Sequence, residues 1–327
     1  LKKQKINYLN GWIIKMSNIK KIIKKILPDK LIYDYRIIQI LPQYIRSKHK
    51  AAKISIPEFK MMSDEETVDC IINKNMSLSR FGDGEFLWMC GQKLNSFQKY
   101  SPELEKRLIN TMKSKNEKLL IGFPKGIIDS HKCNLFARMH WTIIRANYFY
   151  DIAKFLDESQ TYCDASITRP YIDYCDIEFS RHKFENLKRI WDNKNIVIVE
   201  GKKTKLGIGN DLFDNALSIK RIICPAENAF ESLEKIEESI KKNVSKNTLM
   251  LAALGPTATI LASDMCDNGY QMVDIGHIDV EYMWYLHRAI LREPIEGKSV
   301  NESGNRDCSN VYDNDKIYLN SIICEIN

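Results

Sequence analysis

The sequence predicts an α/β protein with a doubly wound, mostly parallel sheet and a basic helical extension at its N-terminus. From about residue 60 onward, strand-like and helix-like runs alternate, and glycine or proline turns separate them. The run 195–200 is continuous in apolar β-branched residues, which is typical of strands that helices cover on both faces. The basic residues, by contrast, gather in the first 50 positions.

Charge and length divide the chain into two parts. The 327 residues are enough for one large domain or two ordinary ones, and the net charge is +7. Residues 1–50 hold 13 Lys and Arg against two acidic residues and so carry +11, which leaves about −4 on the rest. We therefore expect a basic amphipathic helical segment over residues 1–60 and a separate α/β domain over residues 61–327.

Residues 17–27 predict an amphipathic helix that Ser17 caps and Pro28 ends. Its apolar stripe consists of Ile19, Ile22, Ile23, Ile26 and Leu27. Lysines fill the opposite face, a pattern that suits the surface of an anionic membrane. A helix that packs on the domain and leaves its lysines in water is an equal alternative. Nucleic acid is not an expected partner, because stacking aromatics are not interleaved with the basic residues.

Several features point to a cytoplasmic protein that is peripheral at the inner membrane face. No apolar run approaches the ~20 residues that a spanning helix needs, and no signal peptide is visible. The nine cysteines are odd in number and lack C-x-x-C spacing, which favours reduced thiols. The chain begins with Leu1, so two interpretations stay open: a start at Met16, or a fragment.

The secondary structure follows from periodicity, capping signals and turns. Helices are expected over residues 31–45, 63–73, 102–115, 135–156, 184–191, 229–241 and 258–267, with a helix start at 86–89. Strands are expected over residues 76–81, 118–124, 161–167, 195–200, 219–224, 247–254 and 270–275, and an edge strand or helix over 317–323. Ligands of such sheets bind outside the carboxyl ends of the strands, where the polar turns of this chain fall.

The stretch 79–85, Ser-Arg-Phe-Gly-Asp-Gly-Glu, is the first candidate site. Asp83 and Glu85 offer hard oxygen ligands to Mg²⁺ or Mn²⁺, which often bridge to substrate phosphates. Gly82 permits a close backbone approach, and Arg80 can contact a phosphate. A solvated turn rich in Gly and Asp is the alternative interpretation.

Two later turns are candidate phosphate cradles. Gly207 and Gly209 lie in a lysine-bearing loop that a short helix is expected to follow, although neither a P-loop nor a full dinucleotide fingerprint is present. An ordinary loop explains the same pattern equally well. Thr257 follows a strand and is expected to cap the next helix, whose free N–H groups can also hold a phosphate.

The stretch 276–281 places His277, Asp279 and Glu281 at alternate positions after a strand. In an extended backbone all three would point to one face. His277 is then a candidate for a metal or a phosphate, and either carboxylate is a candidate base. Four other histidines have no polar or titratable residues in a comparable pattern beside them and are interpreted as surface or packing residues: His131, His140, His182 and His287.

Taken together, these stretches resemble the GT-D-type glycosyltransferases, a family formerly known as a domain of unknown function from bacterial glycosylation loci. The resemblance covers roughly residues 60–325. It is carried, in order, by Arg80–Glu85, Thr168–Tyr171, Leu206–Phe213, Cys224–Phe230, Ala253–Ala258 and Asp274–Tyr282. Lys205 stands where an arginine is expected, which weakens a bidentate phosphate contact.

The resemblance implies a Rossmann-like fold and transfer of a hexose from a nucleotide sugar, typically UDP-linked, to a glycan, glycoprotein or lipid-linked acceptor. Its D-x-E motif, here Asp83 and Glu85, implies a site for Mn²⁺ or Mg²⁺ and the diphosphate. The residues expected to bind the nucleotide and diphosphate are Arg80, Gly82, Lys205, Gly207, Gly209, Asn210, Thr257 and His277.

The resemblance also extends to the acceptor side of the reaction. Thr168, Arg169 and Tyr171 are expected to bind the acceptor. Asp211 and Glu281 are the candidates for the base that activates its hydroxyl. Two alternatives stay open: a nucleotide-sugar hydrolase with the same metal site, and a non-catalytic scaffold at a membrane surface.

Overall fold

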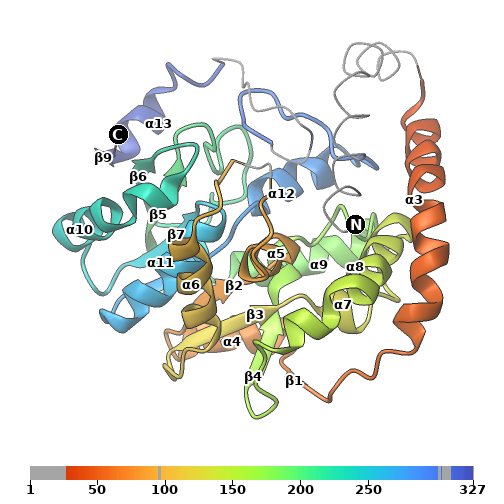
Figure 1. The fold of residues 1–327 in the computed structure, drawn as a ribbon. Coiled ribbons are helices and arrows are strands. Elements are labelled where there is room, and N and C mark those ends of the chain that lie inside the picture. The colour runs from red at the N-terminus through yellow and green to blue at the C-terminus, as the bar shows by residue number, and fades with distance from the viewer. Residues whose placement is uncertain (1–26, 95–96, 301–302, 304–310, 327) are drawn as a thin grey trace.

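The computed structural model describes residues 27–94, 97–300, 303 and 311–326. The expected membrane-binding helix falls on residues 17–27 and therefore lies, except for Leu27, outside the described residues. Within the described ranges the chain forms an α/β fold around one parallel sheet, with helices on both of its faces (Figure 1). The predicted fold class is confirmed.

The sheet has nine strands in the described part of the chain, and every pair of neighbours is parallel. Their spatial order is β1-β4-β3-β2-β8-β7-β5-β6-β9. The strands are β1 (Lys60–Met61), β2 (Ser77–Arg80), β3 (Leu119–Phe123), β4 (Thr161–Asp164), β5 (Asn195–Gly201), β6 (Ser218–Cys224), β7 (Leu249–Ala253), β8 (Gln271–Asp274) and β9 (Ile322–Glu325). The first half of the domain builds outward from β2 through β3 to β4, and the second half builds around β5. The halves meet where β2 pairs with β8, which brings residues from both to one crevice.

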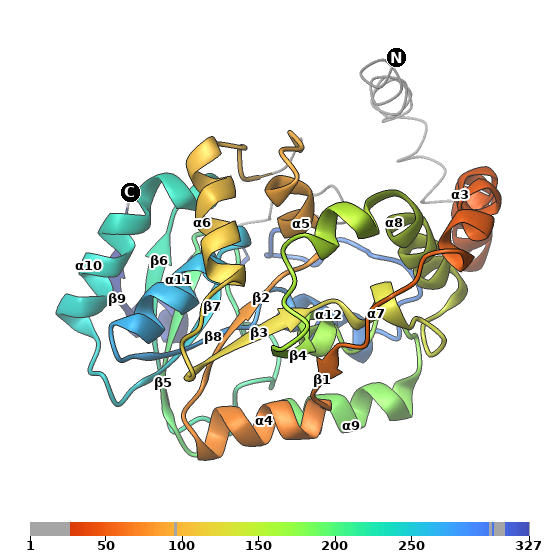
Figure 2. The same cartoon turned by 60° about the horizontal axis from the view of Figure 1, so that its bottom comes forward.

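Two apolar layers sandwich the sheet, and Figure 2 shows the helices that cover its two faces. In β5, Val197 and Val199 face one layer, whereas Ile196 and Ile198 face the other, because successive strand residues point to opposite faces. One layer contains helices α4 (Asp64–Asn73), α9 (Ile177–Lys188) and α12 (Ile278–Leu286). The other contains α5 (Asp83–Met89), α6 (Pro102–Met112), α8 (Leu135–Ala153), α10 (Leu233–Asn243) and α11 (Pro256–Asp267).

Helix starts follow the capping signals of the sequence. Ser63 accepts the N–H of Glu66 at 3.1 Å, and the Glu66 carboxylate accepts the N–H of Ser63 at 2.8 Å, a complete capping box. In α11, however, the N-cap is Gly255, with φ +58°, and Thr257 lies inside the helix. The expectation that Thr257 caps this helix is wrong, because Gly255 is the residue that leaves the helical conformation.

Four local predictions are corrected by the structure. The expected strand 161–167 ends at Asp164, whose carboxylate accepts the N–H of Ser166 at 2.9 Å and turns the chain into a 3₁₀ helix, η1 (Ala165–Thr168). The helix expected at 184–191 lies earlier, over Ile177–Lys188. No helix follows the glycine loop before β6, and residues 278–281 are helical rather than extended.

The N-terminal and C-terminal elements lie at opposite sides of the domain (Figure 1). Helix α3 (Asp29–Ala52) is longer than the predicted 31–45 and packs along α8. At the other side, the run 317–323 forms both α13 (Lys316–Ser321) and the edge strand β9. The remaining short elements are α7 (Lys125–Ile128) and the 3₁₀ helix η2 (Ala229–Ser232). A search of the described helices finds none with the length and apolar character to cross a membrane.

Candidate active site

A cleft of about 470 Å³ opens along the carboxyl edge of the sheet. Residues at or just after the ends of β2 to β8 line it, so the chain delivers polar side chains from both halves of the domain. Its charged and imidazole side chains are Arg80, Asp83, Glu85, His140, Arg169, Asp173, Lys203, Asp274, His277 and Arg292. The position agrees with the expectation that ligands of such a sheet bind at this edge.

Asp83 presents an ionised carboxylate to the cleft. It is the first residue of α5, and its Oδ1 accepts the N–H of Gly84 at 3.0 Å. Its Oδ2 lies 3.1 Å from Nε2 of His140 on α8, and the two side chains are 42% and 39% exposed. Burial acts to raise the pKa of Asp83, but His140 and the charges of Arg169 and Arg292 outweigh it and lower the pKa to about 2.

Glu85 lies in a different environment, although only one residue separates it from Asp83. Its Oε2 accepts the N–H of Gly82 at 2.9 Å and so closes the first turn of α5. Burial, with the nearby charges of Asp274 and Asp83, raises the pKa of Glu85 to about 7. The two carboxylates therefore have distinct roles: Asp83 is ionised in the cleft, while Glu85 also organises the turn that carries it.

Arg80 joins three strand ends at the floor of the cleft. Its Nε donates to the Asp274 carbonyl at 2.7 Å, its Nη1 to the Ala165 carbonyl at 3.0 Å, and its Nη2 to the Asp274 carboxylate at 2.9 Å. A Cβ at Gly276, which has φ +46°, would lie 2.0 Å from that Nη2. The guanidinium is thus committed to positioning the ends of β2, β4 and β8, and only part of it faces the cleft.

Arg169 and Arg292 bring positive charge to the side of the cleft near Asp83. Arg169 Nε lies 3.5 Å from Oε1 of the fully buried Glu281, and Arg292 pairs with Asp173 at 2.8 Å. Glu281 also accepts the N–H groups of Tyr171 and Ile172, at 3.1 and 2.9 Å. Burial raises the pKa of Glu281 to about 7, although Arg169 acts to lower it.

The glycine loop after β5 directs Lys203 into the cleft, whereas Lys205 was the lysine expected there. Lys203 lines the cleft, whereas Lys205 is buried with its Nζ on the Asp313 carboxylate. The Gly207 N–H and the Asn210 side-chain amide both donate to Oδ1 of Asp279, at 2.8 and 2.7 Å. The loop is therefore folded around a buried carboxylate.

Asp279 is itself held inside the domain. Its second carboxylate oxygen pairs with Nζ of Lys298, and both side chains are about 1% exposed. His277, at the N-cap of α12, lines the cleft, but one turn of helix directs Asp279 and Glu281 into the interior. The expectation that all three point to one face is wrong, because the backbone there is helical.

The other predicted site residues do not line the cleft. The Asp211 carboxylate accepts from the Tyr282 hydroxyl at 2.8 Å and lies 3.5 Å from Nζ of Lys188. Thr168, Tyr171 and Thr257 are buried within the core. In total the structure brings six of the predicted residues to the cleft: Arg80, Gly82, Asp83, Glu85, Arg169 and His277. Those it leaves outside are Thr168, Tyr171, Lys205, Gly207, Gly209, Asn210, Asp211, Thr257 and Glu281.

Comparison with known families decides what kind of domain carries this cleft. The family model of the glycosyltransferase GT-D fold matches residues 78–303, a range that contains every cleft residue from Arg80 to Ser299. The chain belongs to the GT-D glycosyltransferase family. The resemblance inferred from the sequence is confirmed.

Relatives and solved structures agree with this assignment. The chain is 36% identical to the glycosyltransferase GlyD of Streptococcus pneumoniae serotype 4 over 80% of its length, and 36% identical to a probable glycosyl transferase Gly of Streptococcus gordonii over 82%. It spans only 32% and 39% of these two relatives.

Two solved structures match the fold with a TM-score of 0.76. One, described as the highly conserved domain of unknown function 1792 with a distinct glycosyltransferase fold, is 34% identical and is matched over 87% of this chain and 100% of its own. The other, a glycosyltransferase of the same domain class from Streptococcus sanguinis, is 33% identical over 83% of this chain and 100% of its own.

Sequence reasoning missed several residues of this GT-D cleft. His140 was expected to be a surface or packing residue, yet it contacts Asp83 across 57 positions of sequence. Asp173, Arg292 and the aromatic side chains of Trp88, Phe97 and Trp141 also line the cleft. No local pattern identifies them, because each comes from a helix or loop whose position depends on tertiary packing.

The donor set of the cleft fits a divalent cation that a substrate helps to bind. Among the residues described, no group of three or more His, Cys, Asp or Glu side chains is arranged to hold a metal ion alone. Asp83 and Glu85 supply hard oxygen atoms, and Mg²⁺ is typically bound by one or two carboxylates together with substrate phosphates and water. The remaining ligands of such an ion would therefore come from a bound substrate and water.

Proposed function

We propose that this GT-D domain transfers a hexose from a nucleotide sugar, UDP-linked in our proposal, to a hydroxyl of a glycan, glycoprotein or lipid-linked acceptor. The observation that carries the proposal is the ionised Asp83 carboxylate in a cleft lined by arginine, lysine and histidine. A diphosphate donor carries two negative charges, and a cation on Asp83 with the surrounding basic groups would neutralise them.

On the donor side, the lining of the cleft offers both charge and aromatic surface. In this proposal Lys203 and His277 contact phosphate oxygens, since both line the cleft. Trp88 and Phe97 provide flat apolar surface that suits a nucleobase or a sugar ring. Arg80 contributes by holding the strand ends in register rather than by binding as a free cation.

In the same proposal Asp83 and Glu85 hold Mn²⁺ or Mg²⁺. The bound ion would act as a Lewis acid that stabilises the negative charge of the leaving nucleotide. His140 fixes the orientation of the Asp83 carboxylate through its Nε2 contact. Glu85 keeps the first turn of α5 closed by accepting the Gly82 N–H, which positions Asp83 toward the cleft.

The proton of the acceptor hydroxyl needs a carboxylate within hydrogen-bond reach. Neither Asp211 nor Glu281 lines the cleft, so neither fits this role in the described arrangement. Asp173 is a better candidate, because it lines the cleft beside Arg292 and lies outside the first turn of α5. Arg169 is retained as an acceptor-binding residue from the sequence prediction, and Thr168 and Tyr171 support it from the core.

We further propose that the protein works at an anionic membrane surface on the cytoplasmic side, through residues 17–27. Helix α3 supports this, because it exposes apolar side chains shortly after that segment, including Leu31, Ile38 and Ile45. Vesicles that contain anionic lipid should bind the full chain and should release a variant that lacks residues 1–28. Equal binding of both proteins would remove this part of the proposal.

A panel of nucleotide sugars, each assayed with Mn²⁺ and with EDTA, tests the main proposal. The expected result is nucleotide release from one UDP-hexose that depends on both the metal and an acceptor. Release of free sugar without an acceptor would instead indicate a nucleotide-sugar hydrolase. Failure to bind UDP with Mn²⁺ by calorimetry would indicate a non-catalytic scaffold.

A further inference from the structure

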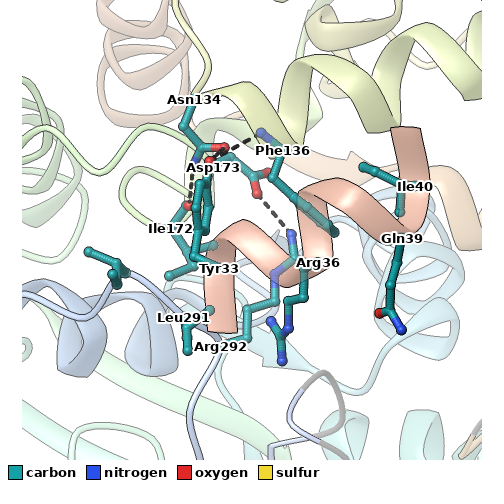
Figure 3. Close-up of a pocket in the computed structure, with 11 residues that line it drawn as sticks. Tyr33, Arg36, Gln39, Ile40, Asn134, Phe136, Ile172, Asp173, Leu291 and Arg292 are labelled. Carbon is teal, nitrogen blue, oxygen red and sulfur yellow. Dashed lines mark hydrogen bonds and ion pairs between the residues drawn. The ribbon is translucent and has the colours of Figure 1, made fainter. Parts of the chain in front are cut away.

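A second cavity, of about 290 Å³, lies beside the cleft and is built in part by α3. Figure 3 shows Tyr33 of α3 beside Asn134 and Asp173, and Arg36 of α3 next to Arg292. Apolar side chains complete the lining: Ile40, Phe136, Ile172, Ile290 and Leu291. Asp173 and Arg292 line both this cavity and the cleft, so they form a shared wall.

The polar side chains of the cavity differ in whether they have hydrogen-bond or ion-pair partners. The Tyr33 hydroxyl accepts the Phe136 N–H at 3.2 Å and lies 3.4 Å from Oδ1 of Asn134, which fixes the start of α8 against α3. Arg292 pairs with Asp173 at 2.8 Å. Arg36, by contrast, has no hydrogen-bond or ion-pair partner among the residues that the structure describes.

Charge in the cavity favours an anion. Its lining holds two arginines against one aspartate, and that aspartate is already paired with Arg292. Burial lowers the pKa of Arg36, and the charge of Arg292 lowers it further, which shows that the two cations act on each other. An anion between them would remove this repulsion and supply Arg36 with a partner.

Arg36 lies outside the residues that the GT-D family model matches. The GT-D model begins at residue 78, whereas α3 ends at Ala52. The residues that line the cleft all lie within the matched range, whereas the cavity also includes side chains of α3. Such a position suits selection of a particular substrate rather than the shared chemistry.

We propose that this cavity is a subsite for an anionic group of the acceptor, a phosphate or a sugar carboxylate, which Arg36 contacts directly. This inference rests on the proposed transferase function. The acceptor would place its hydroxyl in the cleft and extend past the wall of Asp173 and Arg292 to Arg36. The apolar lining would contact the faces of a sugar ring next to the anionic group.

Binding measured with the nucleotide site filled tests this subsite. With UDP and Mn²⁺ present, glucose 1-phosphate and glucuronate are titrated by calorimetry into the wild-type protein and into Arg36→Gln. The expected result is that one of the two ligands binds and that Arg36→Gln weakens it about tenfold or more, as expected for loss of a charge-assisted hydrogen bond. The ligand that binds distinguishes phosphate from carboxylate.

Arg46→Gln is the matched control, because Arg46 is an exposed arginine on the same helix whose Nε donates to the Pro42 carbonyl. Equal weakening by Arg46→Gln and Arg36→Gln, or no binding of either anion to the wild type, would overturn the subsite. UDP affinity is read in the same experiment. UDP binding without anion binding refutes the subsite alone, whereas loss of UDP binding in the wild type refutes the proposed transferase.

Discussion

Replacing Gly276 by alanine should disconnect the strand ends on which the cleft is built. The new Cβ would lie 2.0 Å from Nη2 of Arg80, so the guanidinium would have to move. The terminal atoms of an arginine usually move at little cost, but here Arg80 makes three hydrogen bonds, and its side chain is only 13% exposed. The Nη2 contact to Asp274 is lost first, and the Nε contact to the Asp274 carbonyl is misaligned.

The magnitude follows from two contributions. A non-glycine residue at φ +46° costs about 1 kcal/mol in backbone strain. Loss of hydrogen bonds from a charged group adds about 1.5–3 kcal/mol for the Nη2 contact alone. Gly276→Ala should therefore lower the free energy of unfolding by about 3 kcal/mol or more.

Gly269→Ala is the matched control. Gly269 has φ +79°, but the nearest atom to its added Cβ is Nζ of Lys246 at 3.6 Å, an ordinary contact. Gly269→Ala introduces the same backbone strain as Gly276→Ala but no steric clash, so it should lower the free energy of unfolding by about 1 kcal/mol. Urea denaturation of both variants gives the difference directly. A Gly276→Ala value within 0.5 kcal/mol of Gly269→Ala, by the ~0.5 kcal/mol scale of minor substitutions, would refute the anchoring role of Arg80.

Three further predictions concern buried charge and the cleft. Asp279→Ala should destabilise the domain by about 3–5 kcal/mol in urea, because it leaves Lys298 charged and unpaired in the interior. The free energy of unfolding of the wild type should fall as pH rises from about 4.5 to about 7. That of Glu281→Gln should fall less over the same range. The folded protein binds an extra proton on Glu281 in that range, where its pKa is raised from 4.5 to about 7. His140→Phe should lower kcat about tenfold in a transfer assay, since it removes the group that orients Asp83.

Each of these predictions has a control or a contrary result. Asp211→Ala removes a carboxylate whose side chain is 60% exposed and should cost less than about 1 kcal/mol. Identical pH profiles for the wild type and Glu281→Gln would show that Glu281 ionises normally. His182→Gln changes a 69% exposed histidine on α9 that does not line the cleft, and it should leave kcat unchanged. An equal loss in His140→Phe and His182→Gln would contradict the orienting role.

The strands and most helices were predictable because they depend on local patterns. A buried parallel strand such as β5 is a continuous apolar run in the sequence. Ser63 and Glu66 form a capping-box pattern that predicts the start of α4. The glycine turn at 82–85 was also predictable as a candidate site, because acidic residues beside glycine at a strand end form a local sequence pattern. The stretch around this turn supplied four of the six predicted residues that line the cleft, Arg80, Gly82, Asp83 and Glu85, whereas Arg169 was predicted only from the family resemblance.

The rest of the site depends on contacts that no local pattern contains. Lys203 and Lys205 are two residues apart in one loop, yet one lines the cleft and the other is buried on Asp313. His277, Asp279 and their neighbours fit a strand and a helix equally well over so short a stretch, and the pairing of Asp279 with Lys298 is decided by tertiary packing. Buried carboxylates that hold loops therefore looked like candidate catalytic groups in the sequence.

The central claim is that Asp83 supports sugar transfer in this cleft, and Asp83→Asn tests it most directly. Asparagine keeps the shape and the N–H contact with Gly84 but removes the negative charge that a cation on the donor diphosphate needs. Release of UDP from the UDP-hexose selected by the panel is measured with acceptor and Mn²⁺. The account predicts a loss of at least about a hundredfold in kcat in a variant that remains folded. Turnover by Asp83→Asn within twofold of the wild type would contradict it.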